Sequence, residues 1–269
     1  MRTAFARLCY NLAMRVLMAT ITMNSEILPG VHMLEVQAPQ LARAAQPGHY
    51  CLLRGCSALA YDPLLRRPFF VADVEPGRDT CRFVVYPRGR VSTWLTGQQP
   101  GMTLDLLGPL GHAWDIRPQV RNVLLLGADP LLPSLLLLAR QAVERELAVT
   151  LIHCVERTEE GYPPALLAPE IEYQVLAHGG NAEALAAQVG AYLPWADAVC
   201  CSLSENLLAA LVRAHPRLRE KNVAQAVVGR PLMCVSGTCL ACQLETRHGP
   251  RLVCRDGPVF ALRDVAADW

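Results

Sequence analysis

The chain has 269 residues, enough for two compact domains, and 52% of them are hydrophobic, so each domain can bury a sizeable core. The formal net charge is +1 without a long run of like charges, which argues against nucleic acid as the main partner because phosphate binding needs a basic surface. The longest apolar stretches, such as residues 131–139, are too short to span a membrane.

Residues 1–17 form an N-terminal segment that contains arginines and no acidic residue. This segment is compatible with an amphipathic targeting sequence, with a poorly ordered extension, or with a start upstream of Met18, which also opens a plausible chain. Arginines interrupt its apolar region, so it lacks the pattern of a signal peptide. Without an export signal we expect a cytoplasmic protein, in a reducing compartment where disulfides are rare.

Residues 18–115 are predicted to form an antiparallel β-barrel domain. Short β-rich segments alternate there with four Pro-Gly dipeptides, and many short strands between regular turn signals are typical of barrels. The strands are predicted at residues 32–38, 50–55, 69–74, 81–87 and 102–108.

Residues 116–228 change to alternating strand and helix patterns, which predict a Rossmann-like parallel α/β domain. Residues 112–120 look like the linker before it. The first helix of this domain has Asp129 in a position to act as its N-cap and Pro130 in the first helical position. Strands are predicted at 122–129, 149–156, 172–178, 196–202 and 222–228, and helices at 131–146, 181–191 and 205–214.

Four of the eleven cysteines lie in the last segment, residues 229–269. Their spacing, C-x4-C-x2-C-x11-C, places three thiols on a tight loop and one beyond it, as in plant-type [2Fe–2S] sites. Structural zinc sites usually combine two short pairs instead. The sequence therefore favours a [2Fe–2S] cluster, with zinc or free thiols as alternatives. The proposed ligands are Cys234, Cys239, Cys242 and Cys254.

The order of barrel, α/β domain and cysteine loop resembles the ferredoxin reductase-like flavoproteins. The more specific resemblance is to the electron-transfer subunit of class B dihydroorotate dehydrogenase. It rests on "PG" at 47–48, "DPLLRRPF" at 62–69, "GPLG" at 108–111, the cysteine loop, and "CRDGPVF" at 254–260. The likeness covers nearly all of residues 18–262.

The resemblance implies that the barrel binds FAD. Arg67 matches an arginine whose guanidinium would grip the pyrophosphate, and Ser92 matches a hydroxyl residue that meets the same group. Tyr86 matches a position beside the flavin. The complete set of cofactor-binding residues implied is Arg67, Pro68, Phe69, Phe70, Val85, Tyr86, Pro87, Val91 and Ser92. Within this set the chain departs from the family at three positions, with Phe70 in place of serine, Pro87 in place of arginine and Val91 in place of glycine.

The resemblance also implies a glycine-rich turn for NAD after the first α/β strand. This chain has "GADPLLPSL" at 127–135, where only Gly127 remains. Asp129 puts a negative charge where phosphates would lie, and Pro130 and Pro133 lack N–H donors. The turn is therefore a poor dinucleotide cradle, which leaves direct NADH oxidation by this chain open.

The resemblance implies an electron-transfer subunit in pyrimidine biosynthesis. It would relay electrons between FAD or NAD(H) and a partner through the [2Fe–2S] cluster, without a catalytic residue of its own. The partner implied is a TIM-barrel subunit with FMN that oxidises dihydroorotate, in a heterotetramer. The alternative is an electron-wiring or regulatory subunit that has lost NAD binding and serves another oxidoreductase.

Overall fold

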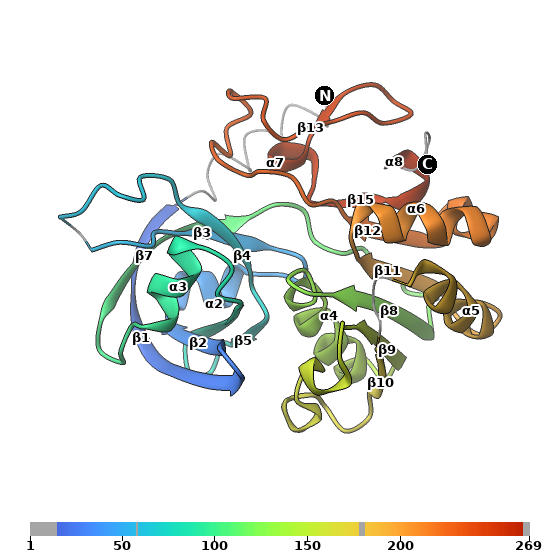
Figure 1. Ribbon diagram of the computed structural model, residues 1–269, viewed down its shortest axis with the longest axis horizontal. Helices are drawn as coiled ribbons and strands as arrows, with labels where there is room; N and C mark the ends of the chain where they lie inside the picture. The colour runs from blue at the N-terminus through green and yellow to red at the C-terminus, as the bar shows by residue number, and fades with distance from the viewer. Residues whose placement is uncertain (1–14, 58, 178–180, 266–269) are drawn as a thin grey trace. The chain divides into compact units, whose positions relative to one another are not determined.

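The structure is a computed structural model that describes residues 15–57, 59–177 and 181–265. The chain divides into two compact units, Met1–Gly111 and His112–Trp269 (Figure 1). Residues 1–14 of the expected N-terminal extension lie outside the described residues. None of the described helices is both long and apolar enough to cross a membrane.

The first unit is an antiparallel sheet of seven strands in the order β4-β3-β7-β1-β2-β6-β5, with two short helices. Its strands are β1 (Arg15–Leu28), β2 (Val31–Gln37), β3 (Tyr50–Leu53), β4 (Arg67–Phe70), β5 (Asp73–Glu75), β6 (Thr80–Val85) and β7 (Thr103–Leu110). The helices are α2 (Pro39–Ala44) and α3 (Arg90–Thr96).

This sheet curls on itself, because its two edge strands follow each other directly in the chain. Only Val71 and Ala72 separate β4 from β5. The Val71 N–H donates to the His49 carbonyl next to β3, whereas the Ala72 N–H donates to the Arg82 carbonyl in β6. Two consecutive residues thus bond to opposite ends of the sheet. The single strand predicted over 69–74 is therefore wrong, because two strands form there. The predicted antiparallel fold of the barrel type is confirmed, although the hydrogen-bonded strand order does not close into a ring.

Strand β1 is the largest element that the sequence analysis missed. Its Ala19 and Ile21 are buried, at 0% and 1% exposure, and face the core. On the other face Val16 and Met18 are 59% and 65% exposed. Apolar residues on both faces hide the period-two alternation that normally reveals a strand.

The second unit has a six-stranded sheet in the order β10-β9-β8-β11-β12-β15, parallel except for β15. This confirms the predicted parallel α/β domain. Helix α4 covers one face of the sheet, and α5 and α6 pack together on the other (Figure 1). The strands are β8 (Asn122–Ala128), β9 (Ala148–Cys154), β10 (Glu172–Leu176), β11 (Ala198–Ser202), β12 (Ala224–Val227) and β15 (Val259–Ala261). The helices are α4 (Pro133–Glu144), α5 (Ala182–Tyr192) and α6 (Glu205–Ala214).

Helix α4 begins at Pro133, so the predicted start at Pro130 is wrong. Asp129 is not its N-cap, because the side chain of Asp129 turns to His153 in β9 instead, at 3.2 Å. Residues 129–132 form a separate turn between β8 and the helix. Proline still occupies the first helical position, where its missing N–H costs no hydrogen bond.

The C-terminal segment folds back onto the α/β sheet. Strand β15 pairs antiparallel with β12, so Val259–Ala261 belong to the second sheet rather than to a separate appendage. Before it, β13 (Gln243–Leu244) and β14 (Arg251–Leu252) form a two-stranded sheet, followed by α7 (Val253–Asp256). Helix α8 (Leu262–Val265) ends the described chain.

Replacement of Gly55 by alanine is expected to destabilise the first unit. A Cβ at Gly55 would lie 2.6 Å from the Cα of Val91 in α3, so backbone would have to move. We expect the free energy of unfolding to fall by about 2 kcal/mol in denaturant titration. Gly77→Ala is the matched control, since its Cβ would meet only the Glu75 carboxylate at 3.6 Å. Equal losses in the two variants would contradict the close approach of Gly55 and Val91.

Candidate functional site

The two-stranded sheet brings the last two cysteines of the quartet together. Cys242 directly precedes β13 and Cys254 follows β14, and Gln243 is paired with Leu252 in register. The Cys254 N–H donates to the Cys242 Sγ at 3.5 Å. Both side chains are buried, with residue exposures of 2% and 1%. Antiparallel pairing therefore creates one close thiol pair from residues twelve positions apart.

The first two cysteines form a second pair on the preceding loop. The Cys239 N–H donates to the Cys234 Sγ at 3.5 Å. The loop between them passes through the left-handed region at Val235 (φ 48°) and Gly237 (φ 80°), and Leu240 (φ 55°) follows. A β-branched residue rarely adopts that conformation, so the surrounding structure must impose this tight wrap.

The two thiol pairs differ in their access to solvent. Cys239 is exposed and Cys234 is partly exposed, whereas Cys242 and Cys254 are both buried. One side of the site is therefore embedded in protein and the other reaches the surface. All ten cysteines that the structure describes are free thiols.

This donor set fits a cluster with two metal ions. Each iron of a [2Fe–2S] cluster is tetrahedral and shares two sulfides, so it takes two protein thiolates, and four cysteines serve it as two pairs. A structural zinc ion needs four ligands around one point.

The thiols also perturb one another electrostatically. Burial raises the pKa of Cys254 to about 12, and contact with Cys242 and the charge of Cys234 add to the effect. At Cys234 burial acts in the same direction, but hydrogen bonds from Cys239 and Ser236 outweigh it and lower the pKa to about 6. Four thiolates this close need positive charge between them, which iron ions supply.

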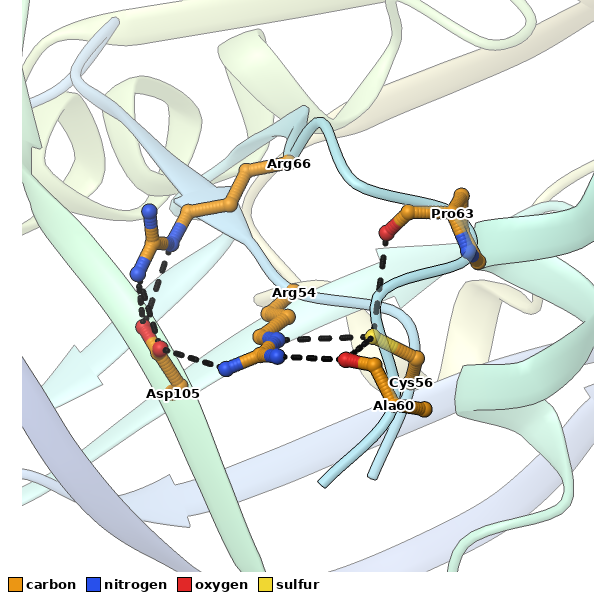
Figure 2. Close-up of polar contacts among 6 residues, drawn as sticks. All are labelled: Arg54, Cys56, Ala60, Pro63, Arg66 and Asp105. Atoms are coloured by element: carbon orange, nitrogen blue, oxygen red, sulfur yellow. Dashed lines mark hydrogen bonds and ion pairs between the residues drawn. The ribbon is translucent and has the colours of Figure 1, made fainter. Parts of the chain in front are cut away.

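In the first unit, an ion-pair network fixes the loop before Arg67. Arg66 donates from Nε and Nη2 to the Asp105 carboxylate of β7, at 2.7–3.1 Å (Figure 2). Arg54 lies 3.9 Å from the same carboxylate and donates to the Ala60 carbonyl at 2.6 Å. The Cys56 thiol adds contacts to the loop carbonyls, at 3.4 Å to Ala60. The loop is thus held from within, and β4 starts from a fixed position.

Arg67 is the first residue of β4, and its side chain is exposed. Within the part of the chain that the structure describes, its guanidinium donates hydrogen bonds to the carbonyls of Leu65 and Arg66 and has no carboxylate partner. An unpaired guanidinium on a strand is available for an anionic group such as a pyrophosphate. Near the end of β6, the Arg88 guanidinium lies 5.9 Å from the ring centre of Tyr86. Arg88 was not singled out in the sequence, yet it returns a positive charge beside Pro87, where the family's arginine is missing.

Two of the predicted flavin-site residues are turned to internal contacts. Val91 is 4% exposed and its side chain packs against Gly55, so its extra bulk lies in the core. The Ser92 hydroxyl accepts from the Gly89 N–H at 3.0 Å and donates to the Gly89 carbonyl at 2.9 Å. Both residues therefore shape the start of α3, and their contact with FAD stays a prediction.

The remaining predicted residues line the adjoining strands. Pro68, Phe69 and Phe70 follow Arg67 in β4 and are partly exposed, with Phe70 edge-on to the ring of Tyr50 at 6.3 Å. β4 lies against β6, which ends at the buried Val85. Pro87 follows as an exposed residue. The predicted residues of β4 and those at the end of β6 therefore lie on strands that contact each other, as residues that bind one ligand must.

The turn after β8 in the second unit contains a buried polar network. His153 of β9 is 0% exposed, and its Nδ1 accepts from the Tyr162 N–H at 3.2 Å. Its Nε2–H is then free to donate to Asp129 at 3.2 Å. Tyr173 of β10 approaches the same Nδ1 at 3.0 Å. The sequence offered no signal for this network, because its members come from three separate strands and turns.

Residues 230–266 match the family model of the iron-sulfur cluster binding domain of dihydroorotate dehydrogenase B. This range contains all four clustered cysteines. Several curated relatives carry the name "Dihydroorotate dehydrogenase B (NAD(+)), electron transfer subunit". The protein of Geobacillus thermodenitrificans is 27% identical and matches over 91% of this chain and 96% of its own length. That of Bacillus velezensis is 26% identical, over 92% and 97%.

Solved structures agree on the fold. An NADH-dependent reduced ferredoxin-NADP oxidoreductase superposes with a TM-score of 0.74 at 19% identity, covering 93% of this chain and 90% of that one. The ferredoxin reductase in carbazole 1,9a-dioxygenase gives a TM-score of 0.60 at 18% identity, covering 75% and 64%. These comparisons confirm the resemblance inferred from the sequence and its fold class.

Asp105→Ala is expected to destabilise the first unit by roughly 2 kcal/mol, because it leaves Arg66 without its half-buried partner. Denaturant titration of the whole chain measures this loss. Asp62→Ala is the matched control, since Asp62 pairs with Arg90 at 74% and 71% side-chain exposure and such pairs contribute little. An unchanged midpoint in Asp105→Ala would show that the network does not hold the loop.

Proposed function

We propose that this chain is the electron-transfer subunit of a dihydroorotate dehydrogenase-like complex. The observation that carries the proposal is the pair of close thiol pairs within residues 230–266, the range that matches the iron-sulfur domain. Relatives named as electron transfer subunits match over nearly the whole chain, which supports a role for both units rather than for the cysteine loop alone.

The four cysteines are proposed to hold a [2Fe–2S] cluster, with Cys234 and Cys239 on one iron and Cys242 and Cys254 on the other. When bound, such a cluster carries one electron at a time and, with every ligand position filled by protein, does not bind substrate. The N–H groups of Cys239 and Cys254 would stabilise the sulfur charge. The exposed pair would form the edge of the site nearest to an external redox partner.

The first unit is proposed to bind FAD. Arg67 and Arg88 supply exposed positive charge for a pyrophosphate, and Tyr86 and Phe70 supply aromatic surface for a flavin ring. Pro68, Phe69, Val85, Pro87, Val91 and Ser92 complete the predicted set. When bound, FAD supplies the exchange between two-electron and one-electron chemistry.

The partner is proposed to be a catalytic subunit of the TIM-barrel type with FMN, which oxidises dihydroorotate in pyrimidine biosynthesis. The relatives' name, an electron transfer subunit, supports the existence of a catalytic partner. A heterotetramer and a cytoplasmic location are part of the same proposal, since four thiolate ligands need a reducing compartment until they bind metal.

A second candidate function is a wiring subunit that no longer uses NAD and serves another oxidoreductase. The observation that favours it is the turn after β8, where Asp129 bonds to His153 in place of an open glycine-rich loop. Both candidates share the cluster and the flavin unit, and they differ in the electron source.

The purified full-length chain is expected to contain about two irons and two acid-labile sulfides per polypeptide, with a visible spectrum that bleaches on reduction with dithionite. Metal and sulfide analysis after anaerobic reconstitution measures this. A zinc-bound, colourless chain would contradict the cluster, because zinc thiolate sites do not absorb visible light.

Cys239→Ser is expected to lose the iron–sulfur absorption and the transfer of electrons to a catalytic partner, because the exposed thiolate ligand is removed. Absorption and partner reduction are measured on the same samples. Cys56→Ser is the matched control, since Cys56 lies in the first unit and a hydroxyl can keep its bond to the Ala60 carbonyl. Full electron transfer by the Cys239→Ser variant would contradict the role of the cluster as an electron relay.

A further inference from the structure

Most backbone donors from the turn after β8 to the start of α4 are already used by nearby carbonyls. Dinucleotide pyrophosphates bind such a turn through free N–H groups at the start of the following helix. Here Pro130 and Pro133 have no N–H. Four further N–H groups bond to nearby carbonyls at 2.8–3.1 Å: those of Leu131 and Leu132 donate to Ala128, that of Ser134 to Leu131, and that of Leu135 to Leu132.

The space over the surviving glycine is filled by a side chain. A Cβ built on Gly127 would lie 2.6 Å from the Cδ1 of Leu132, and Leu132 is 0% exposed. A glycine at this position normally allows a phosphate to approach the backbone closely. In this chain the close approach is made by leucine.

The charge of the turn also opposes a phosphate. Because the Nδ1 of His153 accepts from the Tyr162 N–H, Nε2 is the ring nitrogen that donates to Asp129. Asp129 therefore places a carboxylate in this turn, hydrogen-bonded to a buried histidine. A pyrophosphate brought to the same turn would meet like charge in a partly buried setting, where water screens little.

The polar groups at the switch point of the sheet bond to one another as well. Ligands of doubly wound sheets bind beyond the carboxyl ends of the strands where the strand order reverses, here between β8 and β11. The Ser134 hydroxyl of α4 lies 2.6 Å from the Ser202 hydroxyl at the end of β11, and both residues are 0% exposed. The Trp114 indole N–H donates to the Ser134 carbonyl at 2.9 Å. Polar groups that could have faced a ligand therefore satisfy one another.

From these contacts we propose that the α/β unit of this chain excludes nicotinamide dinucleotides, and that Asp129 and Leu132 are the residues that exclude them. The inference rests on the proposed function only for the identity of the excluded ligand, since NAD(+) stands in the relatives' name. The dinucleotide cradle that the resemblance implies does not fit the residues present. No hydride step between nicotinamide and this chain follows from the structure.

Binding is measured on the full-length chain by isothermal titration with NADH and separately with ADP-ribose, which lacks the nicotinamide. We expect the wild-type chain to bind neither ligand at concentrations up to about 1 mM. A dissociation constant in the micromolar range for NADH would overturn the proposal outright.

Two substitutions test the assigned residues. Asp129→Asn removes the charge but keeps an oxygen that accepts from His153, and Leu132→Ala clears the space over Gly127. The double variant is expected to bind NADH at least about tenfold more tightly than the wild type. Glu220→Gln is the matched control, because it removes one exposed carboxylate from the same unit and should change nothing.

A double variant that keeps its circular dichroism spectrum and binds no better than the wild type would overturn the roles of Asp129 and Leu132. Where Leu132→Ala unfolds the unit, Asp129→Asn decides alone: tighter binding supports the role of the charge, and unchanged binding overturns it.

The visible spectrum of the same samples separates this proposal from the proposed function. A protein that has no iron–sulfur absorption and does not bind NADH would contradict the electron-transfer role but agree with the exclusion of NADH. A protein that has iron–sulfur absorption and binds NADH tightly would contradict only the proposal that the α/β unit excludes NADH.

Discussion

The pairing of β15 with β12 is the constraint on which the cysteine site depends. This antiparallel contact ties the end of the C-terminal segment to the α/β sheet, and the hairpin of β13 and β14 lies just before it in the chain. Gly257 allows the tight return between them, because a Cβ there would lie 2.2 Å from the ring of Phe260. The cysteine loop is therefore built from the framework of the second unit and does not need a domain of its own.

The two thiol pairs differ in burial, so the two sides of the site have different surroundings. Cys242 and Cys254 are enclosed, and burial opposes charge on Cys254. Cys234 and Cys239 lie on the outer loop, where backbone N–H groups favour charge on Cys234. Low polarity and few hydrogen bonds disfavour added negative charge, while hydrogen bonds to sulfur favour it. Each pair has one backbone N–H bonded to a sulfur at 3.5 Å, so the two sides of the site differ chiefly in burial.

Sequence reasoning recovered what depends on local pattern. The buried strand over 122–128 and the helix over 205–214 follow from continuous apolar runs and helical spacing. It failed where a residue's role is set by a distant neighbour. Asp129 looks like a helix cap until His153, 24 positions away, takes its side chain. The local sequence "TLDLLG" does not predict the structural role of Asp105, because Asp105 pairs with Arg66, 39 positions earlier. Likewise the thiol spacing predicted a cluster, but its division into two pairs needed the strand register.

The two regions that the resemblance predicts to bind nucleotides differ from the expected pattern in physically different ways. In the barrel, Val91 places its bulk against Gly55 and Arg88 offers charge next to Pro87, so the changed positions leave anion-binding groups at the surface. In the α/β unit, Ser134 and Ser202 bond to each other and Leu132 covers Gly127. Buried polar groups cost stability when they lack a hydrogen-bond partner, and the two serine hydroxyls supply partners to each other. The parallel sheet can therefore support the cysteine loop, through the pairing of β15 with β12, without a ligand at this position.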